Sequence, residues 1–310
     1  MFWNLFKRVP KPYKTGFLPP QDGHVVSYYA YGNPNGIPVL SFHGGPGGSA
    51  KPKYARLFDL KKYHFIQMDQ RGCGQSQAHD SLFHNDTDAL LSDAYRVLQQ
   101  LEIKEKIIAH GASWGSTLAL LFAEKYPNLV QKIVVSSVFL ARPIDAAWVN
   151  RDSIRFYPDL WAQMRKQVRT EDIHQAYRRL LFSNKTKDNL KALSYLGSYE
   201  YMLGQLDPHF EVLTELDEAA LKSARIYFYY EQNNFFLSEN QILAHSGKIK
   251  QIPALIVHNR MDFCCPPQQA WDLHCALPKS KLVLVAGRGH SSPELLKITK
   301  KEISDFLKEA

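Results

Sequence analysis

The chain has 310 residues, enough for one large or two small domains, and its 45% apolar and 22% charged residues are ordinary for a globular protein. It contains no run of eighteen apolar residues, so we expect no membrane span and no membrane partner. Half of the formal net charge of +8 comes from the opening segment, and no basic helix with interleaved aromatic residues follows, which argues against nucleic-acid binding.

The cysteines and the first residues bear on the compartment. Cys73, Cys264, Cys265 and Cys275 include one adjacent pair and no C-x-x-C, so we expect reduced thiols, neither a zinc ribbon nor a disulfide scaffold. Residues 1–8 have a short apolar stretch followed by charge, which is not the pattern of a secretory signal. We therefore expect a cytoplasmic protein. The sequence does not predict its oligomeric state.

The first third of the chain reads as strands separated by turns. Residues 25–31 are β-rich, residues 32–36 form a Gly-Asn-Pro-Asn-Gly turn, and residues 38–42 are again apolar. This order predicts an antiparallel opening hairpin. The glycine-rich loop 43–48 then leaves the end of the second strand, which is where open α/β sheets place their chemistry.

A third strand, 63–68, leads into a tight loop with charged residues. Asp69 and Arg71 could act on substrate, but we expect an internal ion pair between them that holds the loop. Cys73 lies between two glycines with no histidine beside it and is expected to fill the loop. A helix over residues 86–101, with one apolar face, follows.

A G-x-S-x-G motif lies between a short buried strand, 106–109, and an apolar helix, 117–124. A strand that turns abruptly into a helix crowds the residue at the bend, and glycines two positions on either side relieve the crowding. This context is typical of a nucleophile elbow and predicts Ser113 as the nucleophile. Acyl transfer also needs two N–H groups aimed at the oxyanion, for which Gly45 and Trp114 are the candidates.

After a strand at 133–138 the residue pattern changes from strand-like to helical. Residues 141–245 are helical in pattern, rich in aromatic residues, and too long for a loop, which predicts an inserted helical cap. Strands resume at 252–258 and 281–285, and a helix at 293–308 closes the chain. We therefore predict an α/β-hydrolase fold with a mostly parallel central sheet, in three parts: core residues 1–140, cap residues 141–245 and core residues 246–310.

A serine nucleophile needs a histidine base, and the histidine needs a carboxylate that holds its tautomer. In this fold the acid follows the serine and the histidine comes last. Asp262 and His290 each lie just beyond the carboxyl end of a strand and complete a Ser113, Asp262, His290 triad. The rival candidates for base and acid are set aside by their positions. His43 and His110 lie beside the motif loops, His258 lies in a strand and His274 on a helix, and Asp272 comes one helix later in the chain than the acid should.

With these residues assigned, the chain resembles the proline iminopeptidases, or prolyl aminopeptidases. The resemblance implies a cytoplasmic, metal-free and cofactor-free hydrolase that cleaves the bond after an amino-terminal proline of a small peptide. The segments that carry it are Asp22-Gly23-His24, Gly32-Asn33-Pro34, 43–48, 69–76, 111–120, 256–266 and Gly289-His290-Ser291.

The resemblance is uneven in the cap. Members of this family carry a Trp-Glu pair on one cap helix, and the corresponding place here is Tyr199-Glu200. A second family glutamate follows an Ala-Arg-Ile triplet, but this chain has Tyr227 there. Glu231 is one helical turn further on, and the role is not carried over to it. The resemblance implies substrate binding by Glu200, with Tyr199 and Tyr227 beside it.

Two functions compete on this sequence. One is an aminopeptidase for peptides with amino-terminal proline, and the other is a related hydrolase for small esters or amides that lack a free amine. A binding protein that kept the fold and lost the reaction is disfavoured by the intact candidate triad. An epoxide hydrolase is disfavoured because that chemistry needs a carboxylate at the elbow.

Overall fold

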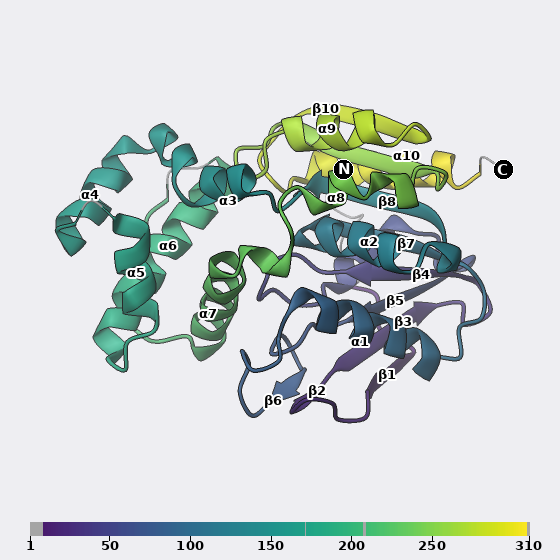
Figure 1. The fold of residues 1–310 in the computed structure, drawn as a ribbon, viewed down its shortest axis with the longest axis horizontal. Helices are drawn as coiled ribbons and strands as arrows, with labels where there is room; N and C mark the ends of the chain where they lie inside the picture. The colour runs from purple at the N-terminus through teal and green to yellow at the C-terminus, as the bar shows by residue number, and fades with distance from the viewer. Residues whose placement is uncertain (1–8, 171, 207–208, 309–310) are drawn as a thin grey trace.

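The computed structural model describes residues 9–170, 172–206 and 209–308, so the expectation for residues 1–8 lies outside the described part. An eight-stranded sheet runs through the core (Figure 1). From β4 and β5 to β10 neighbouring strands are parallel, and β1 and β3 add an antiparallel edge. In spatial order the strands are β1 Lys14–Phe17, β3 Ser27–Gly32, β5 Tyr63–Met68, β4 Ile37–Phe42, β7 Ile107–Ser113, β8 Val130–Val138, β9 Ala254–Met261 and β10 Ser280–Arg288. A separate pair joins β2 His24–Val25 to β6 Gln77–Ala78.

The predicted opening hairpin is wrong. Strands β3 and β4 are not neighbours, because β5 lies between them and pairs antiparallel with β3 and parallel with β4. The turn crosses the start of β5, where Asn33 N–H donates to the Tyr63 carbonyl and Ile37 N–H to the Lys62 carbonyl. The turn lies where the sequence predicts it, but the partner of β3 comes from 32 to 40 residues further along the chain, from Gly32 opposite His64 to Tyr28 opposite Met68.

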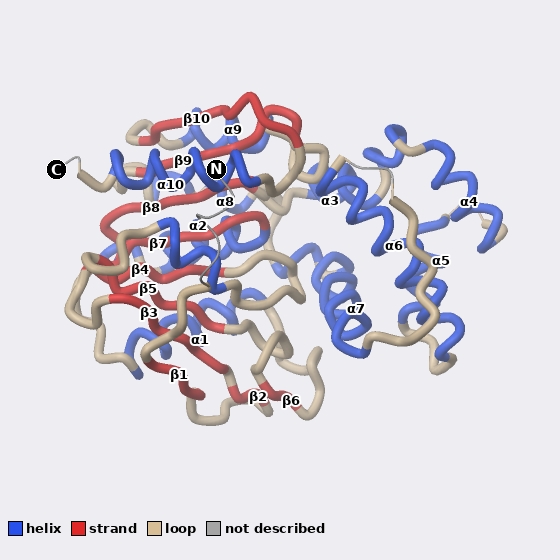
Figure 2. Tube along the Cα trace, turned by 180° about the vertical axis from the view of Figure 1, so that it is seen from behind, coloured by secondary structure: helices blue, strands red, loops and turns tan. Residues whose placement is uncertain are grey.

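The central strands are buried on both faces, which explains their nearly continuous apolar runs. On β9, Ala254 and Ile256 pack on one face while Leu255 and Val257 pack on the other. The first face is covered by α1, α2, α8 and α9, and the second by α10 and η2 (Figures 1 and 2). Their bounds are α1 Thr87–Gln100, α2 Trp114–Lys125, α8 Gln241–Ala244, α9 Gln268–Ala276, α10 Pro293–Phe306 and η2 Pro52–Leu57.

A helical cap projects from the strand ends at one side of the sheet (Figures 1 and 2). It has its own hydrophobic core of buried side chains between Ile154 and Phe228. The chain returns to the main core after α7, where Phe235 and Ile242 join the cluster below α2. The cap helices are α3 Pro143–Asn150, α4 Pro158–Val168, α5 Ile173–Leu181, α6 Thr186–Gln205 and α7 Glu218–Gln232.

Asp69 and Arg71 are both structural, but the expected ion pair between them is wrong. The Arg71 guanidinium is 1% exposed and pairs with Asp93 at 2.6 Å and with Asp22 at 3.2 Å. Asp69 instead accepts hydrogen bonds from the Tyr29 hydroxyl and from backbone N–H groups of the two neighbouring loops. Each charge is therefore satisfied separately, and neither is free to act on substrate.

None of the described helices combines the length and the apolar character needed to cross a membrane.

Candidate active site

Ser113 lies at the bend between β7 and α2 with φ 58° and ψ −131°, a backbone conformation that is rare for any residue with a side chain. The two flanking glycines are required by close contacts. A Cβ on Gly111 would lie 1.9 Å from the Gly115 carbonyl oxygen, and a Cβ on Gly115 would lie 2.2 Å from the Phe42 carbonyl oxygen. The packing around the bend therefore holds the strained serine in place.

The glycine-rich loop 43–48 passes directly beside Ser113. A Cβ on Gly44 would lie 3.3 Å from Ser113 Cβ and 3.8 Å from its Oγ. Gly45, the next residue, is exposed. Trp114, whose N–H follows the serine, has a fully buried side chain. The oxyanion role of the Gly45 and Trp114 N–H groups stays a prediction.

Gln70 connects the glycine-rich loop to the elbow. Its side-chain amide donates to the His43 carbonyl at 2.9 Å, and its Oε1 accepts from the Trp114 indole at 3.0 Å. Its backbone N–H donates to His43 Nε2 at 3.0 Å, so this nitrogen of the buried ring carries no proton. The loop and the elbow are thus held in one relative position, as an oxyanion hole requires.

Asp262 follows β9 and is 1% exposed. Its Oδ1 accepts the backbone N–H groups of Cys264 at 3.0 Å and Cys265 at 2.9 Å, and its Oδ2 accepts from His290 Nδ1 at 2.8 Å. His258 is in addition 3.5 Å away from Oδ2. Burial alone would raise the pKa of Asp262, but the charge of His290 and the hydrogen bonds from His258 and His290 hold it well below its ordinary value. The carboxylate is therefore ionised at neutral pH.

His258 is a neutral brace rather than a second base. Its Nδ1 accepts the Val138 N–H at 3.0 Å, and its Nε2 therefore donates to the Cys265 carbonyl at 2.8 Å. Both ring nitrogens are occupied by hydrogen bonds inside the buried core. This agrees with the expected place of His258 within a strand. Asp262 and His290 form the pair that faces the cap.

His290 is fixed by its backbone and by its ring. Its N–H donates to the Gly204 carbonyl at the end of α6, and its carbonyl accepts from Ser137 Oγ, both at 2.8 Å. Ser137 precedes Val138, which pairs with Ser113 across β7 and β8. Ser113 and His290 are both described, and no hydrogen bond joins Ser113 Oγ to the His290 ring. In enzymes without a bound substrate, the hydrogen bond between nucleophile and base is often long.

The charge around His290 favours its protonated form. Burial opposes the imidazolium, but Asp262, then Cys264 and, to the smallest degree, Glu200 raise the pKa of His290 above its ordinary value. An imidazolium that forms during proton transfer is stabilised by the same charges. The Asp262–His290 pair is therefore arranged to take up a proton from a neighbouring hydroxyl.

Glu200 is the cap carboxylate that acts on this pair. It lies on α6, and its side chain is open to solvent, yet enough protein surrounds the carboxylate for desolvation to raise its pKa, while His290 opposes the rise. The role of Glu200 in substrate binding stays a prediction.

Tyr199, next to Glu200 on α6, lies inside the cap. Its side chain is 8% exposed and packs in the cap core, where its hydroxyl donates to the Val149 carbonyl at 2.9 Å and pairs with Ser153 at 2.6 Å. It also lines a cavity of about 30 Å³ inside the cap. Neighbouring helix positions point in directions about 100° apart, so Tyr199 packs in the cap core while Glu200 on the same helix is exposed.

Tyr227 is half-buried on α7, and its hydroxyl donates to Asn150 Oδ1 at 2.7 Å. Burial raises the pKa of Tyr227 well above its ordinary value, with further contributions from Glu231 and Glu200. Both carboxylates are therefore close enough for their charges to act on the Tyr227 hydroxyl. Glu231, one turn along the same helix face, is also half-buried, and burial raises its pKa while Arg178 lowers it.

A family model for the alpha/beta hydrolase fold matches residues 37–295. The proline iminopeptidases of Xylella fastidiosa and Neisseria gonorrhoeae are 37% and 34% identical to this chain, over 91% and 96% of it and 92% and 98% of their own lengths. The proline iminopeptidase of Arabidopsis thaliana is 36% identical over 92% of this chain and 77% of its own. This chain belongs to the proline iminopeptidase family. The resemblance found in the sequence is thereby confirmed.

Solved structures place this iminopeptidase-family chain in the same fold class. An esterase from a Rhodococcus species has a TM-score of 0.62 at 18% identity, over 95% of this chain and 98% of its own. An enol-lactonase from Burkholderia xenovorans has a TM-score of 0.57 at 18% identity, over 95% and 100%. At such identities the likeness concerns the fold alone, and it confirms the predicted α/β-hydrolase architecture.

Sequence reasoning missed two features of this iminopeptidase-family site. Gln70 bridges His43 and Trp114, and nothing in the loop sequence singles it out. The adjacent cysteines, expected only to be reduced thiols, lie beside His290. The C-C pair that begins two residues after Asp262 was the available signal for the second feature, whereas the role of Gln70 depends on contacts between distant segments.

Proposed function

We propose that this iminopeptidase-family chain releases amino-terminal proline from short peptides through a Ser113, His290, Asp262 triad. Ser113 Oγ attacks the scissile carbonyl and passes its proton to His290 Nε2, while Asp262 holds Nδ1–H and the resulting charge. His290 then protonates the leaving amine, and water releases proline from the acyl-enzyme by the same route in reverse. The N–H groups of Gly45 and Trp114 bind the oxyanion.

The observation that carries this proposal is the position of Glu200. A protonated amine in a cleft needs a compensating negative charge, because an unpaired desolvated cation is costly. Glu200 is a partly desolvated carboxylate whose charge acts on His290 from the cap side. A bound ammonium group offsets the desolvation of this carboxylate and lies within reach of the reacting bond.

The second candidate is a hydrolase for small esters or amides without a free amine. It is favoured by Tyr227, which stands where the second family glutamate is expected and donates its hydroxyl proton to Asn150. A neutral hydroxyl supplies no countercharge. The two functions differ in one property that can be measured, the dependence of turnover on a charged amine.

We also propose a small-molecule substrate, a cytoplasmic location, and no requirement for a metal ion, a cofactor, a membrane or a nucleic acid. The four cysteines are all free, in keeping with a reducing compartment.

Replacing Glu200 by glutamine tests the amine site. We expect kcat/KM for proline p-nitroanilide to fall by about 10- to 100-fold, the loss typical of one charged hydrogen bond, while p-nitrophenyl acetate is hydrolysed at nearly the parent rate. Glu215→Gln, at an exposed cap position, is the matched control and should change neither reaction. An equal loss on both substrates for Glu200→Gln would favour the neutral-substrate hydrolase.

Replacing Tyr227 by glutamate tests the second position. The added carboxylate should raise kcat/KM for proline p-nitroanilide relative to that for p-nitrophenyl acetate, because only the anilide carries a positive amine. Tyr227→Phe removes the hydroxyl without adding charge and should leave the ratio unchanged. A glutamate variant whose ratio equals that of the phenylalanine variant would exclude position 227 from the amine site.

A further inference from the structure

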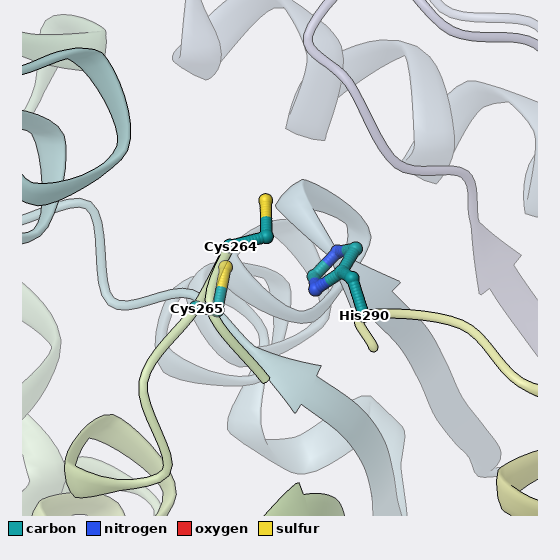
Figure 3. Close-up of side chains that lie close together, drawn as sticks. All are labelled: Cys264, Cys265 and His290. Atoms are coloured by element: carbon teal, nitrogen blue, oxygen red, sulfur yellow. The ribbon is translucent and has the colours of Figure 1, made fainter. Parts of the chain in front are cut away.

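Three metal-ligating side chains meet at the edge of the candidate active site. The sulfurs of Cys264 and Cys265 and a ring nitrogen of His290 all lie within 4.8 Å of one another. Figure 3 shows the two thiols on the loop after β9, facing the His290 ring. All four cysteines of the chain are free, so this pair is available as thiols.

One buried carboxylate positions all three of these residues. Asp262 Oδ1 accepts the backbone N–H groups of both cysteines, while its Oδ2 accepts from the His290 ring. A carboxylate that orients a histidine and the neighbouring ligands in this way is the usual outer shell of a metal site. The same loop is braced by the cap, because Phe263 stacks on Phe156 at 4.3 Å and its carbonyl accepts from Trp148.

The ligand set defines the kind of ion. Two thiolates and one imidazole suit zinc and related thiophilic divalent ions. With bonds of about 2.3 Å, ligand atoms of a tetrahedral site lie about 3.7 Å apart, so the present separations need to close by only about 1 Å. Two thiolates balance the charge of a divalent ion, and the nearby Glu200 carboxylate adds to the negative potential at the cleft.

Access to the site comes from the cleft side. Cys265 is 2% exposed, but Cys264 is only partly buried, and the Glu200 side chain beside it is open to solvent. An ion can therefore reach Cys264 first and then recruit the remaining ligands.

We propose that Cys264, Cys265 and His290 form an inhibitory binding site for a thiophilic divalent metal ion such as Zn²⁺. The inhibition rests on the proposed function, in which His290 is the base, whereas the binding itself does not. Two thiols lose their protons to solvent, two S–metal bonds and one N–metal bond form, and nothing is oxidised or reduced. Coordination through Nε2 occupies the lone pair that accepts the Ser113 proton, and coordination through Nδ1 displaces the hydrogen bond to Asp262. For the Nδ1 contact the ring proton first moves from Nδ1 to Nε2, so Nε2 again cannot accept the Ser113 proton. Either contact stops the reaction until the ion is removed.

Binding is measured first, without any substrate. Cd²⁺ is titrated into the chelator-treated full-length protein, kept reduced with a non-thiol reductant, and the cadmium–thiolate charge-transfer absorption is recorded. We expect saturation at one ion per chain, and loss of at least about tenfold in affinity for Cys264→Ser. Cys275→Ser, which removes an exposed cysteine on α9, is the matched control and should bind like the parent. No saturable absorption, or equal binding by Cys264→Ser, overturns the site.

Inhibition is measured second. Zn²⁺ should abolish hydrolysis of proline p-nitroanilide, EDTA should restore it, and the inhibitory concentration should rise at least about tenfold for Cys264→Ser but stay unchanged for Cys275→Ser. The rate at which a fluorophosphonate labels Ser113, with and without Zn²⁺, compares the parent with the same two variants and needs no aminopeptidase substrate. If the anilide is not a substrate but Zn²⁺ still blocks labelling in the Cys264-dependent way, the proposed function fails and the metal site stands. If Cd²⁺ binds but neither activity nor labelling changes, the inhibitory role is excluded.

Discussion

Replacing Ser113 by alanine lowers kcat for proline p-nitroanilide by about 10⁴- to 10⁶-fold and leaves the fold intact. The large loss follows from covalent catalysis, because no other group can form the acyl-enzyme once Oγ is absent. The fold survives because only one oxygen is removed, while the bend itself is held by Gly111 and Gly115. Steady-state kinetics and thermal unfolding of the same preparation measure the two parts.

The matched control is Ser92→Ala on the exposed face of α1, whose hydroxyl caps only a local carbonyl. It should have normal activity. Near-normal turnover by the Ser113→Ala protein would contradict the proposed mechanism. A strongly lowered melting temperature in that variant would show that its loss of activity comes from a damaged fold.

Replacing Asp262 by asparagine lowers kcat by about 10⁴-fold. The asparagine oxygen can still accept the N–H groups of Cys264 and Cys265, so its NH₂ group faces His290 Nδ1. His290 Nδ1 then has to accept a hydrogen bond from this NH₂ group, so the ring proton moves to Nε2. In that tautomer Nε2 can no longer take the proton of Ser113. Asp272→Asn is the matched control, since that carboxylate pairs with Arg142 on the surface of α9 and should contribute little to the rate.

The pH profile separates a tautomer effect from a general loss of structure. Asp262 raises the pKa of His290, and the base is active only when neutral, above that pKa. Removing the charge lowers the pKa, so the acid limb of kcat/KM for the residual activity should move to lower pH, measured with EDTA present. A limb that stays in place, or moves to higher pH, would show that Asp262 does not set the protonation of His290.

Much of this site could be predicted because its residues sit next to strand ends. The G-x-S-x-G motif and the glycine-flanked His290 each follow an apolar strand, and strand ends of a parallel sheet meet at one edge. The chain order of Ser113, Asp262 and His290 then selected the candidates among twelve histidines. Local pattern was sufficient to select these candidates because each of them lies next to the strand that positions it.

The remaining features depend on contacts between distant segments. The insertion of β5 between β3 and β4 is decided by pairing energies across the sheet, and no turn signal records it. Tyr199 was assigned to the substrate site with Glu200, but the helix turns it into the cap core. Likewise Arg71 pairs with Asp22 and Asp93 because these segments converge on it, whereas Asp69 is nearer in sequence.

An aminopeptidase of this kind binds a free amine next to the bond that Ser113 attacks. This property is tested most directly by comparing kcat/KM for proline p-nitroanilide and N-acetylproline p-nitroanilide on the metal-free protein. The two substrates share the ring and the leaving group and differ at the amine, which is charged in the first and acylated in the second. We predict that the free-amine substrate is hydrolysed at least about tenfold faster, as the pairing of one ammonium group with Glu200 requires. Equal or faster hydrolysis of the acetylated substrate would contradict the aminopeptidase assignment.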